Sequence, residues 1–412
     1  AALIMGTSSI GAVVLAGFAV LLLVLCFAEA GSYFDRPGGA YLYTREAFGP
    51  LIGFEVGWMT WLARVASVAS LSVGFAQALS HLLPAVGGGW GQLLAITLSL
   101  LGLTVINIVG IRAGVGTAVF LAISKIVPLL VFVGIGVFYV TGQTMDANDV
   151  ERSGSLREAA LLLLFAYAGF ENTAAPAGEF KNPRRDIPFA LVAQIVIVTL
   201  IYSAVQWVAL GTLPGVAQSA TPLADAARLF LGGWGGWLLT FGAAVSILGT
   251  NNNTVLAGPR YLFAMAEDGF GPRALTYLHP RFRTPVVTIV LQSSIALLLA
   301  LTGATLVQEG LRLPPVLRGS FEQLALLSVV ARLATYFGTA AAVLVLRRKR
   351  PGGAAVRLPW GPVIPVAAML LCVGFAAAAT REKLIAGGIA IMVGLLLYLF
   401  GRRREINSGT AS

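Results

Sequence analysis

Long runs of apolar residues, separated by short polar segments, extend along the whole chain. Apolar residues fill each run and do not alternate with polar ones, as they would in the strands of a membrane barrel. Several runs exceed the length of about 18 residues that indicates a helix crossing a bilayer. The pattern predicts an all-α polytopic membrane protein with eleven spans, at about 10–31, 50–80, 91–110, 115–140, 159–180, 187–211, 236–257, 285–304, 321–346, 359–379 and 384–401.

Composition supports this class and excludes a water-soluble domain. Hydrophobic residues make up 57% of the chain and charged residues only 11%, whereas soluble domains carry about 25% charged residues. The 48 glycines suit close helix packing, because small residues let membrane helices approach one another.

The net charge of +10 is unevenly distributed between the two sides of the predicted spans. Most Lys and Arg residues fall on the side that holds Lys181, Arg184, Arg347 and the C-terminal Arg402. Basic residues concentrate on the cytoplasmic side of membrane proteins. We therefore expect a cytoplasmic C-terminus in the inner membrane, and the basic charge does not indicate a nucleic-acid partner.

The start of the chain suggests a further span. With eleven spans and a cytoplasmic C-terminus, Ala1 would lie outside the cell, and residues 1–5 resemble the tail of a helix. The chain shows neither the basic segment nor the cleavage site of a signal peptide. The expectation is an N-terminally truncated, twelve-span protein whose first transmembrane helix is missing.

One predicted span, 159–180, contains residues that disfavour a helix. Gly169 and Glu171 lie near its middle, followed by Pro176 and Gly178; Gly costs about 1 kcal/mol and Pro about 3 kcal/mol in a helix interior. The span could be merely kinked, with neighbours that satisfy its backbone, or Glu171 could lie near an interface. An ionisable residue at membrane depth more often has a function, and unwound helices are the substrate-binding device of many transporters.

Three motifs give the chain a family resemblance. They are "CFAEAGSYFDRPGGAYLYTREAFGPLIGFEVGWMTWL" (26–62), "FAYAGFENTAAPAGEFKNPRRDIPFAL" (165–191) and "TNNNTVLAGPRYLFAMAEDGFGP" (250–272). In this order the chain resembles the amino acid–polyamine–organocation superfamily. The resemblance implies a transporter with five-plus-five inverted repeats and two additional C-terminal helices. It implies one transmembrane domain over 1–412, with the remainder of the first repeat at 10–140, the second repeat at 159–346, the additional helices at 359–401 and a cytoplasmic tail at 402–412.

The resemblance also implies a substrate site at the broken span. The family places an aromatic lid at the position of Phe165 and a side-chain-sensing residue at that of Ala168, although helix packing is a commoner role for aromatic residues. The family's other half-site, a Gly-Ser-Gly stretch in its first helix, does not occur here. The expected substrate-binding residues are Phe165, Ala166, Tyr167, Ala168, Gly169, Phe170 and Glu171.

Lys125 and Ser246 are the expected proton-coupling residues. Lys125 lies about nine residues into its predicted span, roughly 13 Å deep at 1.5 Å per residue, which makes snorkelling to the interface difficult. Proton-coupled members of the family carry a lysine on this helix, where related transporters bind sodium. Ser246 would be its partner, or a serine that simply packs between helices.

Other polar residues allow two interpretations. Glu29, Arg45, Glu46 and Glu55 would pair with loop arginines at the cytoplasmic end, or form an inner gate. Arg64 is deep in its span and could face a cavity or a carboxylate, and Arg332 could be its counterpart in the second repeat; the sequence assigns no role to either. Residues 251–253, all Asn, suggested a polar helix end.

The expected function is secondary active transport of amino acids by alternating access, with protons as the coupling ion. An amino-acid exchanger or an amine or polyamine carrier is the alternative, and a membrane sensor or assembly subunit ranks lower. An enzyme is not expected, because the spans contain no Ser/His, paired Asp or His-Glu-x-x-His set, and His81 and His279 have no metal-ligand spacing. No Gly-x-x-x-x-Gly-Lys loop occurs, so nucleotide hydrolysis is not indicated as the energy source. No cofactor or metal is expected.

Overall fold

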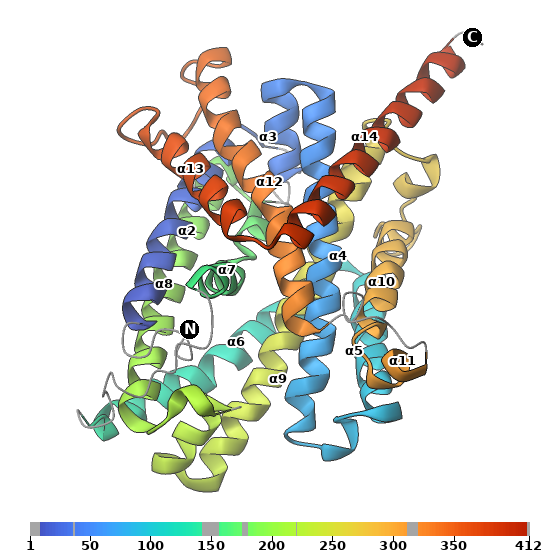
Figure 1. The fold of residues 1–412 in the computed structure, drawn as a ribbon. Helices are drawn as coiled ribbons and strands as arrows, with labels where there is room; N and C mark the ends of the chain where they lie inside the picture. The colour runs from blue at the N-terminus through green and yellow to red at the C-terminus, as the bar shows by residue number, and fades with distance from the viewer. Residues whose placement is uncertain are drawn as a thin grey trace.

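The computed structural model describes residues 9–35, 38–141, 156–174, 180–219, 221–310 and 320–409, and within these ranges it contains helices and no strands. The helices form one elongated bundle (Figure 1). In chain order the α-helices are α2 (Ser9–Gly31), α3 (Gly39–Phe48), α4 (Pro50–Ser80), α5 (Gly89–Val109), α6 (Ile111–Gly136), α7 (Leu156–Tyr167), α8 (Pro183–Thr212), α9 (Pro222–Glu267), α10 (Val286–Leu301), α11 (Thr305–Gly310), α12 (Phe321–Lys349), α13 (Val363–Ala378) and α14 (Arg381–Gly409).

The predicted spans coincide with apolar helices. Within the described residues, eight helices have the length and composition to cross a membrane, and three shorter apolar helices correspond to the remaining predictions. The all-α prediction is confirmed. Helix α9 extends beyond the predicted span 236–257: it consists of two helices joined at Gly232, whose backbone leaves helical geometry (φ 68°, ψ −161°), the second of which begins near the predicted start and continues to Glu267.

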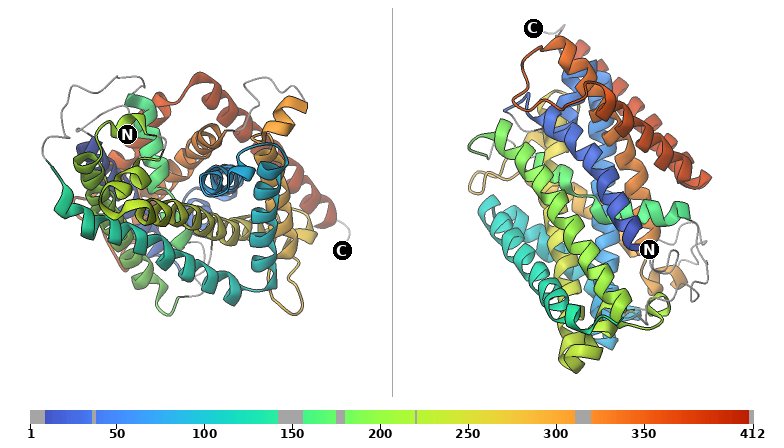
Figure 2. Two further views of the ribbon diagram at one scale, coloured as in Figure 1. Left: turned by 90° about the horizontal axis from the view of Figure 1, so that it is seen from below. Right: turned by 90° about the vertical axis from the view of Figure 1, so that its left-hand side faces the viewer.

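Helices α4 and α12 form the interior of the bundle. In each of them 72% of the most apolar 18-residue window is buried, against 11% for α14 and 18% for the span at Val119–Tyr139. Figure 2 shows α4 surrounded by other helices when the bundle is viewed along its length. Outer helices expose large apolar side chains, for example Phe120 (68%) and Leu370 (67%). Such a surface suits lipid, which leaves the interior as the place for polar groups.

Glycines bring α6 and α9 into close contact. A Cβ atom built on Gly242 would lie 2.8 Å from Pro128 Cγ, and one built on Gly249 would lie 2.8 Å from Leu121 Cβ. Both distances are shorter than side chains tolerate, so only glycine permits this approach. The two contacts fix the register of α6 against α9 on either side of Lys125.

The predicted helix break is confirmed at Gly169. Helix α7 ends at Tyr167, and a short 3₁₀ helix, η6 (Phe170–Ala174), continues the chain. Between them Gly169 has φ +114°, a conformation that residues with a Cβ atom rarely adopt. A Cβ atom built there would have no neighbour within 4 Å among the described residues, which leave open space beside the break. Pro176 and Gly178 lie outside the described residues.

The prediction of a polar helix end at residues 251–253 was wrong, because these residues lie inside α9. Asn251 Nδ2 donates to Ser72 Oγ at 3.0 Å, and Asn107 Nδ2 donates to Asn252 Oδ1 at 2.9 Å. These are hydrogen bonds between helices, which pair buried amide groups across the bundle.

Candidate functional site

The helix break directs Glu171 into the interior of the bundle. Its side chain is fully buried (0% exposed). The Gly169 N–H, freed by the end of α7, donates to Glu171 Oε2 at 2.9 Å. A buried carboxylate needs such partners, because its transfer out of water is costly. The break therefore supplies both the turn that points Glu171 inward and one of its hydrogen bonds.

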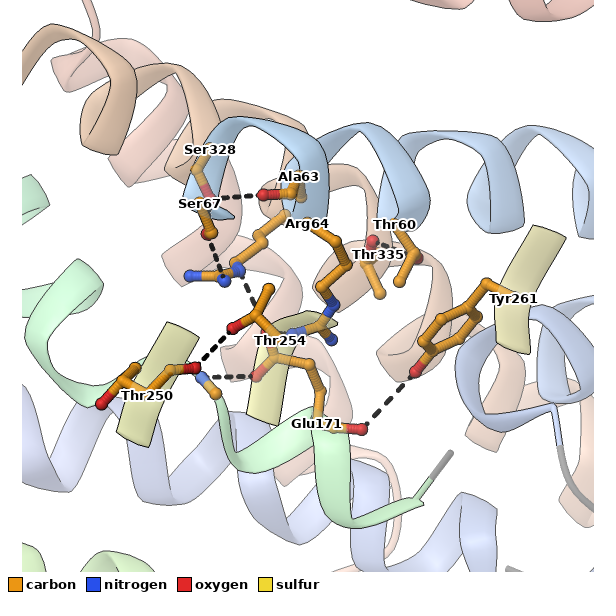
Figure 3. A network of polar contacts seen from close by, with 12 residues as sticks. Thr60, Ala63, Arg64, Ser67, Glu171, Thr250, Thr254, Tyr261, Ser328 and Thr335 are labelled. Carbon is orange, nitrogen blue, oxygen red and sulfur yellow. Dashed lines mark hydrogen bonds and ion pairs between the residues drawn. The ribbon is translucent and has the colours of Figure 1, made fainter. Parts of the chain in front are cut away.

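Two arginines from different helices meet this carboxylate. Arg64 of α4 places Nη1 3.3 Å from Glu171 Oε1, and Arg332 of α12 places Nε 3.0 Å from the same oxygen. The arginine side chains are only 1% and 6% exposed. Figure 3 shows the Arg64 and Glu171 side chains pointing toward one another in the centre of the bundle. We call Arg64, Glu171 and Arg332 the charge cluster.

Hydroxyl groups hold Arg332 in place. Its Nη2 donates to Ser67 Oγ at 2.8 Å, and Ser67 Oγ lies 2.7 Å from Ser328 Oγ. Ser328 Oγ in turn donates to the Ala63 carbonyl at 2.9 Å. This chain of hydrogen bonds ties α4 to α12 beside the charge cluster, so the position of Arg332 is fixed by both helices.

Aromatic rings enclose the charge cluster. The Arg64 guanidinium lies 5.8 Å from the centre of the Tyr261 ring, and that of Arg332 lies 5.9 Å from the Phe165 ring. At these distances a cation is attracted by the face of a ring. Phe170 packs against Tyr336 with 5.3 Å between ring centres.

The predicted substrate residues divide into two groups. Tyr167, Phe170 and Glu171 are buried, and the Tyr167 hydroxyl donates to the Val13 carbonyl at 3.0 Å. Phe165, Ala166, Ala168 and Gly169 retain exposed surface. Of these four, Ala166 is exposed and the others are half-buried, and the Phe165 ring packs against Phe321 and lies near Arg332.

The predicted coupling residues lie along the α6–α9 contact. Lys125 and Ser246 are both half-buried, between the two glycine contacts described above. Among the described residues, no hydrogen bond joins Lys125 to Ser246; the Ser246 carbonyl accepts a bond from Thr250 Oγ1 at 3.0 Å.

Charged residues also pair at the end of the bundle where α12 finishes. Glu29 Oε1 and Oε2 each lie 2.6 Å from an Arg347 nitrogen, and Arg350 Nη2 lies 2.7 Å from Glu46 Oε2. The predicted pairing with arginines is confirmed for Glu29 and Glu46.

Two members of that group behave differently. Arg45 pairs with the carboxylate of Asp268, at the C-terminal end of α9, at 2.8 Å. Glu55 has no hydrogen-bond partner for either carboxylate oxygen among the described residues. It lies against α14, where a Cβ atom on Gly394 would be 2.6 Å from Glu55 Oε2.

Sequence reasoning found Glu171 and allowed that Arg64 faces a carboxylate, but it did not identify Glu171 as the group that Arg64 and Arg332 share. The available signal was the presence of Arg64 and Arg332 deep in apolar runs, where charged residues are rare and usually paired. The described residues contain no group of three or more His, Cys, Asp or Glu side chains placed to hold a metal ion.

Comparison with known proteins supplies the family. Residues 1–395 match a family model described as amino acid permease. The chain is 29% identical over 392 residues to the serine/threonine exchanger SteT of Bacillus subtilis, with 92% of this chain and 85% of that protein covered. It is 26% identical to the branched-chain amino acid permease BcaP of the same organism (95% and 85% covered). It is also 26% identical to that organism's methylthioribose transporter (97% and 87% covered).

Proposed function

Because the chain belongs to the amino acid permease family, we propose that it carries amino acids across the cytoplasmic membrane by alternating access, driven by a proton gradient. The substrate lies at the helix break around Gly169, and the C-terminus faces the cytoplasm. The arginine-rich end of α14 supports this orientation.

The observation that carries the proposal is the interrupted helix beside buried charges. The α7 helix stops in the interior of an apolar bundle, and Gly169 borders open space. Backbone groups released at such a break can bind the charged ends of a zwitterion, because unwound carbonyls attract an ammonium group and a helix N-terminus attracts a carboxylate. The seven residues from Phe165 to Glu171 would line this site.

Proton coupling is assigned to Lys125. It is a single amine in an apolar helix, and its position in the chain falls between Leu121 and Pro128, where glycine contacts keep α6 close to α9. A change of protonation at this contact would alter how α6 packs on α9. A proton-driven cycle requires such a change, because a bound proton shifts a conformational equilibrium only if it interacts differently with the two conformations.

Exchange of one amino acid for another is the second candidate. The similarity to the serine/threonine exchanger SteT favours it over an amine carrier. An exchanger needs substrate on both sides of the membrane and no proton gradient.

Uptake into proteoliposomes tests these alternatives. The purified protein should accumulate radiolabelled amino acids when the lumen is alkaline, and accumulation should not require internal substrate. We expect Lys125→Ala to abolish gradient-driven uptake while leaving substrate binding measurable; unchanged uptake in this variant would remove Lys125 from the mechanism. Uptake that depends on internal amino acid and ignores the gradient would support exchange. Absence of any amino-acid binding or flux would refute the proposed function.

A further inference from the structure

We propose that the charge cluster recognises a carboxylate on the substrate side chain, so that the transported amino acid carries one net negative charge. This inference rests on the proposed function and specifies its substrate class. Arg64 is the residue that makes the contact, and Arg332 contributes to the positive potential.

Arg64 has unused hydrogen-bonding capacity. A guanidinium group carries five N–H donors, and the Arg64 side chain is only 1% exposed. Among the described residues its nitrogens make no hydrogen bond of good geometry; its contacts are the ion pair with Glu171 and the neighbouring Tyr261. Its ion pair with Glu171 is long, at 3.3 Å. Buried donors are normally satisfied, so this side chain is placed for an acceptor that arrives from outside the protein.

The charge balance indicates which acceptor is needed. Within 4.0 Å of the two guanidinium groups, the described residues provide one carboxylate, that of Glu171. Two positive charges and one negative charge leave a buried excess of +1. A neutral zwitterion does not cancel this excess, whereas an amino acid with an acidic side chain does. A planar carboxylate also matches the paired donors of an arginine.

The charge cluster adjoins the helix break. Glu171 bonds the two arginines through Oε1 and the Gly169 N–H through Oε2. A zwitterion held by the backbone at Gly169 would extend its side chain from open space toward the arginines. The free backbone groups would bind the ammonium and α-carboxylate that all amino acids share, and the arginines would bind the side chain, which differs between them.

Paired substrates that differ by one charge test the proposal on the wild-type protein. Binding and uptake of L-aspartate and L-glutamate would be compared with those of L-asparagine and L-glutamine, which have nearly the same size. We expect the acidic member of at least one pair to bind about tenfold to a hundredfold more tightly, the range that a charge-assisted hydrogen bond provides.

Substitutions at Arg64 then locate the effect. In Arg64→Gln the charge cluster becomes neutral, so the preference for the acidic member should disappear, and the amide member should bind equally well or better. Arg64→Lys keeps the charge and should retain part of the preference. Arg228→Gln is the matched control, because Arg228 is 59% exposed and pairs with Asp225 away from the charge cluster; it should behave as wild type.

The outcomes separate this inference from the proposed function. If the acidic and amide members of each pair bind and are taken up equally well, the inference is overturned and the transport function stands. The same result is expected if a small inorganic anion balances the charge of the cluster. No binding of any amino acid would overturn both. If Arg64→Gln does not fold, the wild-type comparison and Arg64→Lys still decide: a preference that Arg64→Lys retains at least in part supports a role for charge, and no preference in wild type refutes it.

Discussion

Replacing Glu171 by Gln removes the one negative charge that two buried arginines share. At an effective dielectric constant of about 20, an ion pair at 3.0–3.3 Å has an attraction of about 5 kcal/mol. Most of this offsets the cost of removing the charges from water. Loss of one partner of a buried pair typically destabilises a protein by about 3–5 kcal/mol, because the remaining charges are left uncompensated. We expect a loss in this range.

The substitution is well suited to isolating the charge. Glutamine has the shape of glutamate, and its amide oxygen can still accept the Gly169 N–H bond. Unfolding free energies would be measured by equilibrium titration with SDS in mixed micelles, for wild type, Glu171→Gln, Arg64→Gln and the double variant. Because the two residues interact, the double variant should lose clearly less than the sum of the single losses.

A small effect would contradict this reasoning. If Glu171→Gln costs less than about 1 kcal/mol, or if the two substitutions are additive, then the Glu171 carboxylate does not compensate the arginines. The charge balance used above would then be wrong as well.

Two further predictions concern the break and the paired end of the bundle. Gly169→Ala meets no steric obstacle among the described residues but forces a residue with a Cβ atom to φ +114°. It should lower the free energy of unfolding by about 1–3 kcal/mol and reduce uptake. Its control is Gly102→Ala, in the regular helix α5 with no described neighbour within 4 Å, which should be neutral or stabilising in the same titration. Glu29→Gln should cost about 3 kcal/mol, because Glu29 is fully buried against Arg347 and also accepts the Leu358 N–H at 2.9 Å. Glu46→Gln is its control, because Glu46 is 24% exposed and its partner Arg350 is 45% exposed, so this pair should contribute no more than about 1 kcal/mol. Equal losses of stability in the two variants would show that burial does not determine how much each ion pair contributes.

Part of the candidate site was predictable from local sequence. Gly169 and Glu171 stand out because glycine weakens a helix and a carboxylate is unfavourable at membrane depth. Both effects depend on residues within one or two helical turns. The break was therefore found at the correct residue, whereas the extent of α9 was not, since the kink at Gly232 looks the same in sequence as a glycine that packs against a neighbour.

The sequence by itself determined the all-α membrane class, the positions of the apolar helices, the break and, through its motifs, the family. These follow from hydrophobicity and backbone preference, which are properties of short windows of chain. Only the tertiary structure decided that Arg64 and Arg332 meet at Glu171, and that Asn251 and Asn252 bond between helices. Which face of one helix meets which face of another depends on how side chains from distant segments fit together, and the pattern along the chain does not contain that information.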